Sequence, residues 1–443
     1  MHSRNLLLAL LGLGMAVVSS AQIKHTSVPL GDAIHQALEK SLLTGPNGKP
    51  FHIRISVTEP ENPQSPYQGT IEEWWVSKDQ WRREVTAKNG MHQTIVVSNG
   101  AHTESDQGDY FPLWLRNFVN AAFDPLPNGI ESAFAASGAT IDQITMPDGR
   151  KSMPCARFKV KVGHDQTAID FFTNVCFDNE AHLQFFDFPG YGMEFHDFRP
   201  FGKTSVAREL ADDPESGTHL VGKVQVLEDE SKADTPALFK HLPTDDNRFR
   251  SVAVSTPQLE KMIASIPPPV WPSVRSGHLE GNVSVYLSID THGNIREDWP
   301  LTGDNGEIHD FLRDQAVQWK VKPAVDSSGA PVQVEGSISF HFQTHIGKPL
   351  PVVTGDDIPK QLLNCTYNPK LSAGLLPKGT TFEIKVGIDQ NGSEAGASFH
   401  VPPSVPWSVV AGTGLTDSHC RFKPFLEDGK PTFYSIEFIF TAP

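Results

Sequence analysis

Four cysteines are the residues of this chain with the most definite chemistry. An even number of cysteines in an exported chain is typical of disulfide bonds. The chain has no C-x-x-C pair and no histidine at ligand spacing from a cysteine pair, so neither a redox motif nor a metal site is expected. Three connectivities are possible, and we favour Cys155–Cys176 and Cys365–Cys420 because each bond then stays within one predicted domain.

No catalytic constellation is present in the sequence. It lacks the G-x-S-x-G, H-E-x-x-H, P-loop and dinucleotide-binding patterns. His196-Asp197 and the pair His102 and Asp106 have acid–base residue types, but no second group supports them. The stretch 290–293 lacks the alternating oxygen ligands and distal glutamate of a calcium loop, so it is predicted to be a turn. We therefore expect a non-enzymatic protein without metal or cofactor.

Charge and the N-terminus indicate where the protein works. The chain has 37 Lys and Arg residues and 52 Asp and Glu residues, which gives a net charge of −15. This charge argues against nucleic acid and anionic membrane surfaces as partners. Residues 1–21 resemble a signal peptide, with an apolar run from Leu6 to Val18 and a cleavage site after Ala21. An uncleaved anchor is the alternative. We expect an exported, soluble protein of the periplasm or cell envelope.

The region 22–232 is predicted to be rich in antiparallel strands. Alternating runs such as 51–57 and 94–97 indicate half-buried strands, and 113–121 indicates a helix. Trp74 and Trp75 should point to opposite faces of their strand, and Arg82-Arg83 should lie on a solvated face. The motifs G-T-I-E-E-W-W…W-R-R-E, V-V-S-N-G and V-C-F-D-N-E-A-H-L resemble the LolA/LppX-like fold. That resemblance implies a half-barrel covered by helices that carries acyl chains or lipids, and it transfers no binding residue.

A second resemblance lies in the stretch 281–342. Two alternating runs flank a predicted helix that starts near Asp304 and Glu307, and Pro323 stops it. The motifs G-x-V-x-V-x-L-x-I-D-x-x-G-N, A-V-x-W-K-V-K-P-A and G-x-P-V resemble the TonB C-terminal domain. We assign residues 265–345 to this module and 233–264 to a linker in which a short helix near 256–263 is the alternative.

The segment 346–443 repeats this module. Phe382 to Gly392 aligns with the first alternating run, and Gly429-Lys-Pro431 aligns with Gly329-Ala-Pro331, at offsets of about 100 residues, which indicates a tandem duplication. Prolines and glycines between Val401 and Gly414 make the second copy degenerate where the first has its helix.

The predicted fold class is α+β, with a β-rich curved half-barrel followed by two small antiparallel-sheet-plus-helix modules. The TonB resemblance implies strand addition by an outer-membrane receptor or another envelope protein, in connection with outer-membrane transport. The expected edge is the last strand of the first module, unless the second module covers it: Gln333, Val334, Gly336, Ile338, Phe340 and Phe342. The alternative function is a periplasmic carrier of lipid or another hydrophobic ligand. Contact with a membrane is expected only through a partner or an uncleaved N-terminal segment.

Overall fold

The structure is a computed structural model of the whole chain. It describes residues 39–45, 47–126, 140–144, 153–162, 169–178, 180–212, 219–230, 237–243, 248–266, 280–303, 315–316, 318–343, 351–364, 370–371, 374–402, 405–406, 409–410, 412–415 and 420–443. The predicted signal peptide and most of the helix predicted after Asp304 lie outside these residues. No helix among the described residues is long and apolar enough to cross a membrane.

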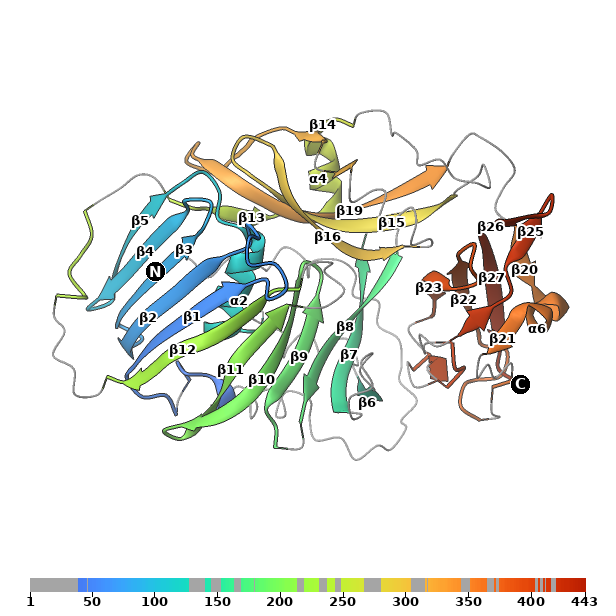
Figure 1. Cartoon of the computed structure of the whole chain (residues 1–443), viewed down its shortest axis with the longest axis horizontal. Coiled ribbons are helices and arrows are strands. Elements are labelled where there is room, and N and C mark those ends of the chain that lie inside the picture. Colours follow the sequence, from blue (N-terminus) through green and yellow to red (C-terminus); the bar gives the residue numbers. More distant parts are fainter. Residues whose placement is uncertain are drawn as a thin grey trace.

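A twelve-stranded antiparallel sheet forms the first domain and curves into an open half-barrel (Figure 1). Its strands run in the order β5-β4-β3-β2-β1-β12-β11-β10-β9-β8-β7-β6, so the pairing of β1 with β12 joins the two halves. The strands are β1 Phe51–Thr58, β2 Gly69–Ser77, β3 Gln80–Ala87, β4 His92–Ser98, β5 Ala101–Gln107, β6 Thr140–Ile144, β7 Met153–Val162, β8 Ile169–Phe177, β9 Leu183–Phe188, β10 Tyr191–Phe201, β11 Thr204–Asp212 and β12 Val221–Asp229. The predicted α+β class with a curved, β-rich first domain is confirmed.

One face of this sheet packs on the helix α2, Leu113–Phe123. Strand β1 shows why, because its buried residues alternate with less buried ones along the whole strand. Phe51, Ile53 and Ile55 face the helix side and belong to one hydrophobic core with Leu115 and Phe118 of α2. The sequence predicted this helix correctly, and its apolar residues explain why it fills the concave side of the sheet.

Cys155 and Cys176 are directly opposite each other on β7 and β8 and form a disulfide. This part of the predicted connectivity is confirmed. Cys420 is also disulfide-bonded, and its predicted partner Cys365 lies outside the described residues.

The first small module (module 1) contains a sheet in the order β13-β19-β15-β16. Its elements are β13 Ser251–Ala253, α4 Thr256–Met262, β14 Ile263–Ser265, β15 Glu280–Ile289, β16 Ile295–Gly303, β17 Lys320–Val321, β18 Ala324–Val325 and β19 Pro331–Gln343. Strand β13 pairs with β19, and β14 pairs with β17. Residues 251–264 of the expected linker are thus part of the module, and the alternative of a short helix there is α4, which begins with a Ser255–Gln258 capping box.

The second small module (module 2) contains the corresponding sheet, in the order β20-β27-β22-β23. Its elements are β20 Val352–Thr354, η4 Gly355–Asp357, α6 Ile358–Gln361, β21 Leu362–Asn364, β22 Thr381–Ile388, β23 Glu394–His400, β24 Arg421–Phe422, β25 Phe425–Glu427, β26 Lys430–Thr432 and β27 Tyr434–Thr441. A Cβ atom on Gly293 would lie 1.9 Å from the Val321 carbonyl oxygen, and one on Gly392 would lie 2.0 Å from that of Phe422. The two copies therefore share the same glycine-dependent turn.

The two small modules lie beside the half-barrel (Figure 1). Figure 1 shows the sheet of the first module lying across one end of the half-barrel and the second module beside the end that carries β6, β7 and β8. The sheet of the first module contacts the N-terminal part of α2. The C-terminal end of α2 faces the concave side of the half-barrel.

Candidate functional site

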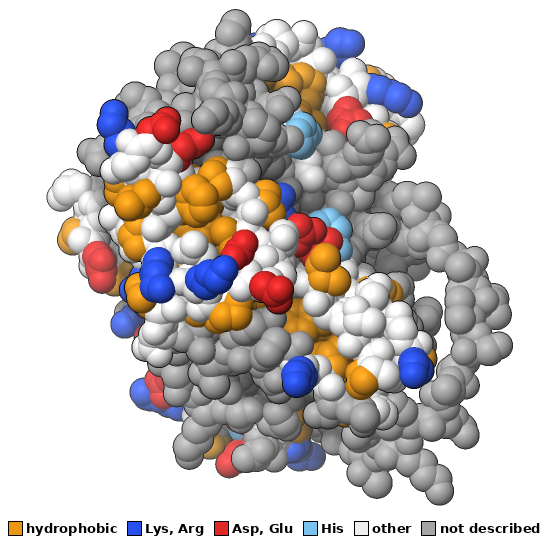
Figure 2. Space-filling view, turned by 90° about the vertical axis from the view of Figure 1, so that its right-hand side faces the viewer, with side chains coloured by type: hydrophobic (Ala, Val, Ile, Leu, Met, Phe, Trp, Pro, Cys, Tyr) orange, Lys and Arg blue, Asp and Glu red, His pale blue; other side chains and the backbone are white. Residues whose placement is uncertain are grey.

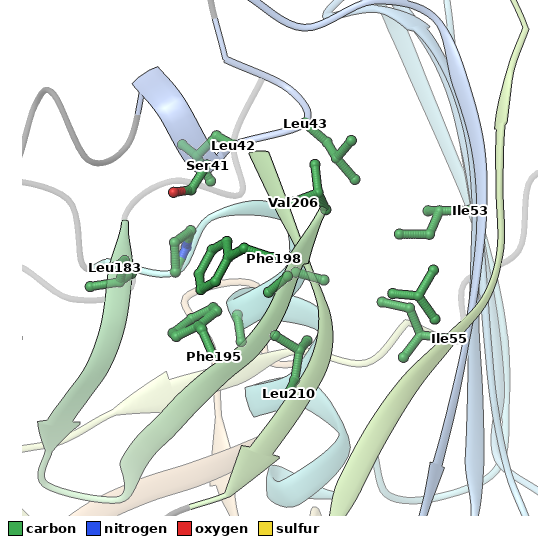
Figure 3. A pocket seen from close by; sticks show the side chains of 15 residues that line it. Ser41, Leu42, Leu43, Ile53, Ile55, Leu183, Phe195, Phe198, Val206 and Leu210 are labelled. Carbon is green, nitrogen blue, oxygen red and sulfur yellow. The ribbon is translucent and has the colours of Figure 1, made fainter. Parts of the chain in front are cut away.

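An apolar groove lies between the concave face of the half-barrel and the C-terminal end of α2 (Figure 3). Strand β1 contributes Ile53 and Ile55, and α2 contributes Ala121 and Ala122. Figure 3 shows these β1 side chains opposite those of β10 and β11. The facing residues are Phe195 and Phe198 on β10 and Val206 and Leu210 on β11, with Leu42 and Leu43 above them.

The groove is closed in this structure. Its volume is about 30 Å³, which is room for one or two water molecules and far too little for an alkyl chain. Among the residues that line it, Ser41 has the one polar side chain, and its hydroxyl is buried without a hydrogen-bond partner in the described part of the chain. Such a lining favours an apolar ligand and offers no acid, base or nucleophile arrangement.

A buried ion pair lies farther along the helix side of the sheet. Arg83 Nε donates to Glu73 Oε2 at 2.5 Å, and the Arg83 guanidinium lies 4.2 Å from the centre of the Phe123 ring. Burial raises the pKa of Glu73, and the charge of Arg83 opposes that shift. The prediction that Arg82-Arg83 lies on a solvated face is therefore wrong for Arg83, because a carboxylate buried to this degree needs a cation beside it.

The N-terminal end of α2 is held by the first module. Glu297 on β16 accepts hydrogen bonds from the backbone N–H groups of Leu113 and Trp114 and from the Tyr110 hydroxyl. These free N–H groups and the helix dipole make a carboxylate favourable there. Burial raises the pKa of Glu297, and the donors from Tyr110, Leu113 and Trp114 oppose the shift.

Two further contacts fix the same helix end. Arg116 forms an ion pair with Glu335 on β19. The side-chain amide of Gln333 donates to the Phe111 carbonyl at 3.1 Å, and its oxygen accepts from the Phe111 N–H at 2.9 Å. Module 1 thus anchors one end of the helix whose other end lines the groove.

Part of the predicted strand edge on β19 is already paired within the chain. Gln333 and Val334 pair with β13, so this part of β19 is already occupied by the chain itself. Gly336 faces the Val254 carbonyl, which an added Cβ would approach to 2.7 Å. From Ile338 through Phe340 to Phe342, β15 is the one strand that pairs with β19 among the described residues. Strand addition stays a prediction for that half of β19, while the other half has no free edge.

Trp74 and Trp75 stack on neighbouring rings, and His196 contacts a neighbouring carboxylate. Trp75 stacks on Phe51 in the core, and Trp74 stacks on His52 on the opposite face, as predicted. His196 lies 2.9 Å from Glu194 rather than pairing with its neighbour Asp197. The predicted turn at 290–293 is present, with Asp290 Oδ1 accepting from the N–H groups of residues 292 and 294.

One group of described residues has metal-ligand chemistry. The ligand atoms of His52, Glu228 and Glu230 lie within 4.8 Å of one another. His52 Nε2 also lies 2.7 Å from Glu72 Oε1. The sequence did not indicate this group because His52 is more than 170 residues from the two glutamates and meets them only through the pairing of β1 with β12.

Hydrophobic side chains are exposed on the second module. Leu363, Leu426 and Ile439 are each at least 60% exposed. Figure 2 shows the side of the molecule where this module lies, with hydrophobic side chains gathered beside Lys, Arg, Asp and Glu. No segment among the described residues covers these three side chains.

Sequence reasoning missed the residues that build the groove and the anchor. The groove residues carry only the alternation signal of ordinary core strands, which does not separate a lining residue from a packed one. Arg116 is a single charge within an apolar stretch, and that isolation is the one signal that would have marked it, whereas Glu297 stands between Arg296 and Asp298 and carries no such signal.

Comparison with known proteins gives weak likenesses to solved structures. No family model and no curated protein matches the chain. A LolA superfamily protein from Nitrosomonas europaea is 9% identical, with a TM-score of 0.23, over 47% of this chain and 97% of its own. A putative outer membrane lipoprotein-sorting protein domain from Vibrio parahaemolyticus is 10% identical, with a TM-score of 0.24, over 47% and 98%. At TM-scores this low, these likenesses assign no ligand and no role to this chain.

Proposed function

We propose that this protein is an exported, non-enzymatic cell-envelope protein that binds the apolar chain of a lipid or a similar ligand inside its half-barrel. One observation carries this proposal: the groove between the concave face and α2 is lined by apolar side chains from five strands, β1 and β9 to β12, and from α2. Burial of an alkyl chain there gains about 25 cal/mol for each Å² of apolar surface removed from water.

Binding requires the groove to open. The present volume of about 30 Å³ excludes an alkyl chain, so a ligand has to separate α2 from β1 and β11. Module 1 holds the N-terminal end of α2, whereas Ala121 and Ala122 near its C-terminal end present only small side chains to the groove.

Displacement of the fluorescent probe N-phenyl-1-naphthylamine by laurate tests the proposal. Ala122→Phe should abolish displacement because the larger ring fills the opening, whereas Ala101→Phe on the exposed start of β5 should leave it unchanged. Circular dichroism checks that both variants are folded. Wild-type protein that binds neither probe nor laurate, and that carries no lipid in native mass spectrometry, contradicts the proposal.

A second candidate function is the binding of an outer-membrane receptor or another envelope protein by strand addition. One observation favours it: β27 pairs with β20 only as far as Glu437, and the next residues include the 64% exposed Ile439. Retention of a receptor peptide by the wild type and by Leu426→Asp, but not by Ile439→Asp, would support it. Equal retention by all three proteins would count against this edge.

A further inference from the structure

The half-barrel has an opening between two of its strands. Strands β11 and β12 are each nine residues long, yet only three residue pairs join them, from Glu209–Lys223 to Ala211–Val221. Next to this point, the register of β12 against β1 shifts between Arg54 and Ile55. An open cavity of about 550 Å³ lies where the two strands part, and β10 contributes to its wall.

The cavity is charged, and one of its cations has no partner among the residues that the structure describes. Arg199 pairs with Asp197 at 2.7 Å, and Lys223 lies 3.3 Å from Glu209. Arg208 forms neither an ion pair nor a hydrogen bond within the described part of the chain, and its Nε is buried without a partner. Burial lowers the pKa of Arg208, the charge of Arg199 lowers it further, and Asp197 opposes the shift. An unpaired guanidinium atom out of water is costly and gains most from an anion.

This cavity adjoins the apolar groove. Val224 lines both spaces, and Arg208 lies on β11 between Val206 and Leu210, which line the groove. An amphiphile whose alkyl chain occupies the groove can therefore leave its head group in the cavity. The arrangement places a charged cavity that contains Arg208 next to an apolar groove.

We propose that the half-barrel selects amphiphiles with an anionic head group, carboxylate or phosphate, and that Arg208 binds this head group at the opening between β11 and β12. The inference rests on the proposed ligand-binding function and deepens it. The planar guanidinium matches both anions through paired N–H donors.

The experiment compares laurate, dodecyl phosphate and dodecanol as competitors of N-phenyl-1-naphthylamine, with wild type, Arg208→Gln and Arg54→Gln. Arg54 is a matched control because it lies on the outer face of β1 and is paired with Glu72. In the wild type, the anionic competitors should bind better than dodecanol. Arg208→Gln should weaken them by about tenfold or more, the value of a lost charge-assisted hydrogen bond, and leave dodecanol unchanged. Arg54→Gln should behave as the wild type.

The outcomes separate this inference from the function on which it rests. If all three competitors bind and Arg208→Gln changes none of their affinities, the head-group site is refuted while the apolar groove stands. If none binds the wild type, both are refuted. Preferential loss of laurate points to a fatty acid, and preferential loss of dodecyl phosphate points to a phospholipid; either result supports the site.

Discussion

Gly190 fixes the contact between the half-barrel and the first module. Its φ is +74°, and an added Cβ would lie 2.3 Å from the ring of Tyr286, a buried residue of β15. Glycine is the residue that accepts both the backbone angle and the close approach of the ring. One residue without a side chain thus permits two sheets to meet.

Gly190→Ala should destabilise the protein more than Gly90→Ala. Gly90 also has a positive φ, of +90°, but no atom lies within 4 Å of its added Cβ, so that variant carries the backbone cost alone. The displaced Tyr286 ring should add about 1–3 kcal/mol in Gly190→Ala. Urea unfolding followed by tryptophan fluorescence measures the difference, and equal losses in the two variants would show that the ring is free to move.

Glu394, at the start of β23, makes stability depend on pH. Burial raises its pKa to about 7, above the value of about 4.3 in an unfolded chain. The folded state therefore binds the proton more tightly, and the stability that this proton supplies is lost as the pH rises from about 4.3 to about 7.

Glu394→Gln should remove this dependence. The variant should gain stability over the wild type at pH 8, by about 1–3 kcal/mol, and show little gain at pH 4. Thermal unfolding at a series of pH values measures the effect, with the exposed Glu61→Gln as the control. A gain that is the same at both pH values would mean that Glu394 is not the titrating group.

At the scale of the elements, the sequence predicted strands better than it predicted their ends and neighbours. Alternating residues from Phe51 to Val57 and from Val332 to Phe342 correctly marked β1 and β19. The three-residue strands β13 and β14 were assigned to a linker because so short a segment has no periodicity. They join the module through pairing with β19 and β17, a tertiary effect.

The opening between β11 and β12 shows the same limit. Lys223, Val224, Gln225 and Leu227 all line the charged cavity, and the register shift beside Arg54 and Ile55 falls at Gln225. A run such as Val224-Gln225-Val226-Leu227 is compatible with a regular strand or with a bulge. The groove could be expected from the predicted half-barrel, but its opening and Arg208 could not.

The whole molecule joins units that the sequence presents as separate. The Glu297 carboxylate accepts a hydrogen bond from the Leu113 N–H, 184 positions away, and the Tyr110 hydroxyl donates to that of Ser288, 178 positions away. No local pattern encodes such contacts, so the predicted three-part organisation contained no interface. In the structure, α2 belongs to the half-barrel core and also carries the contacts to β16 and β19.

Because α2 belongs to the half-barrel core and also contacts module 1, we expect ligand binding to alter module 1. An alkyl chain that enters the groove should displace the C-terminal end of α2. Glu297 should pass this displacement to β16 because its carboxylate accepts hydrogen bonds from the N–H groups at the N-terminal end of the helix. Laurate should therefore alter amide hydrogen exchange in β16 and β19 as well as in α2, and leave β22 and β27 of module 2 unchanged. Glu297→Gln, which loses the charge at the helix end, should still bind laurate but confine the altered exchange to α2 and the groove. Altered exchange in β16 and β19 of Glu297→Gln at the wild-type level would show that the two units communicate by another route.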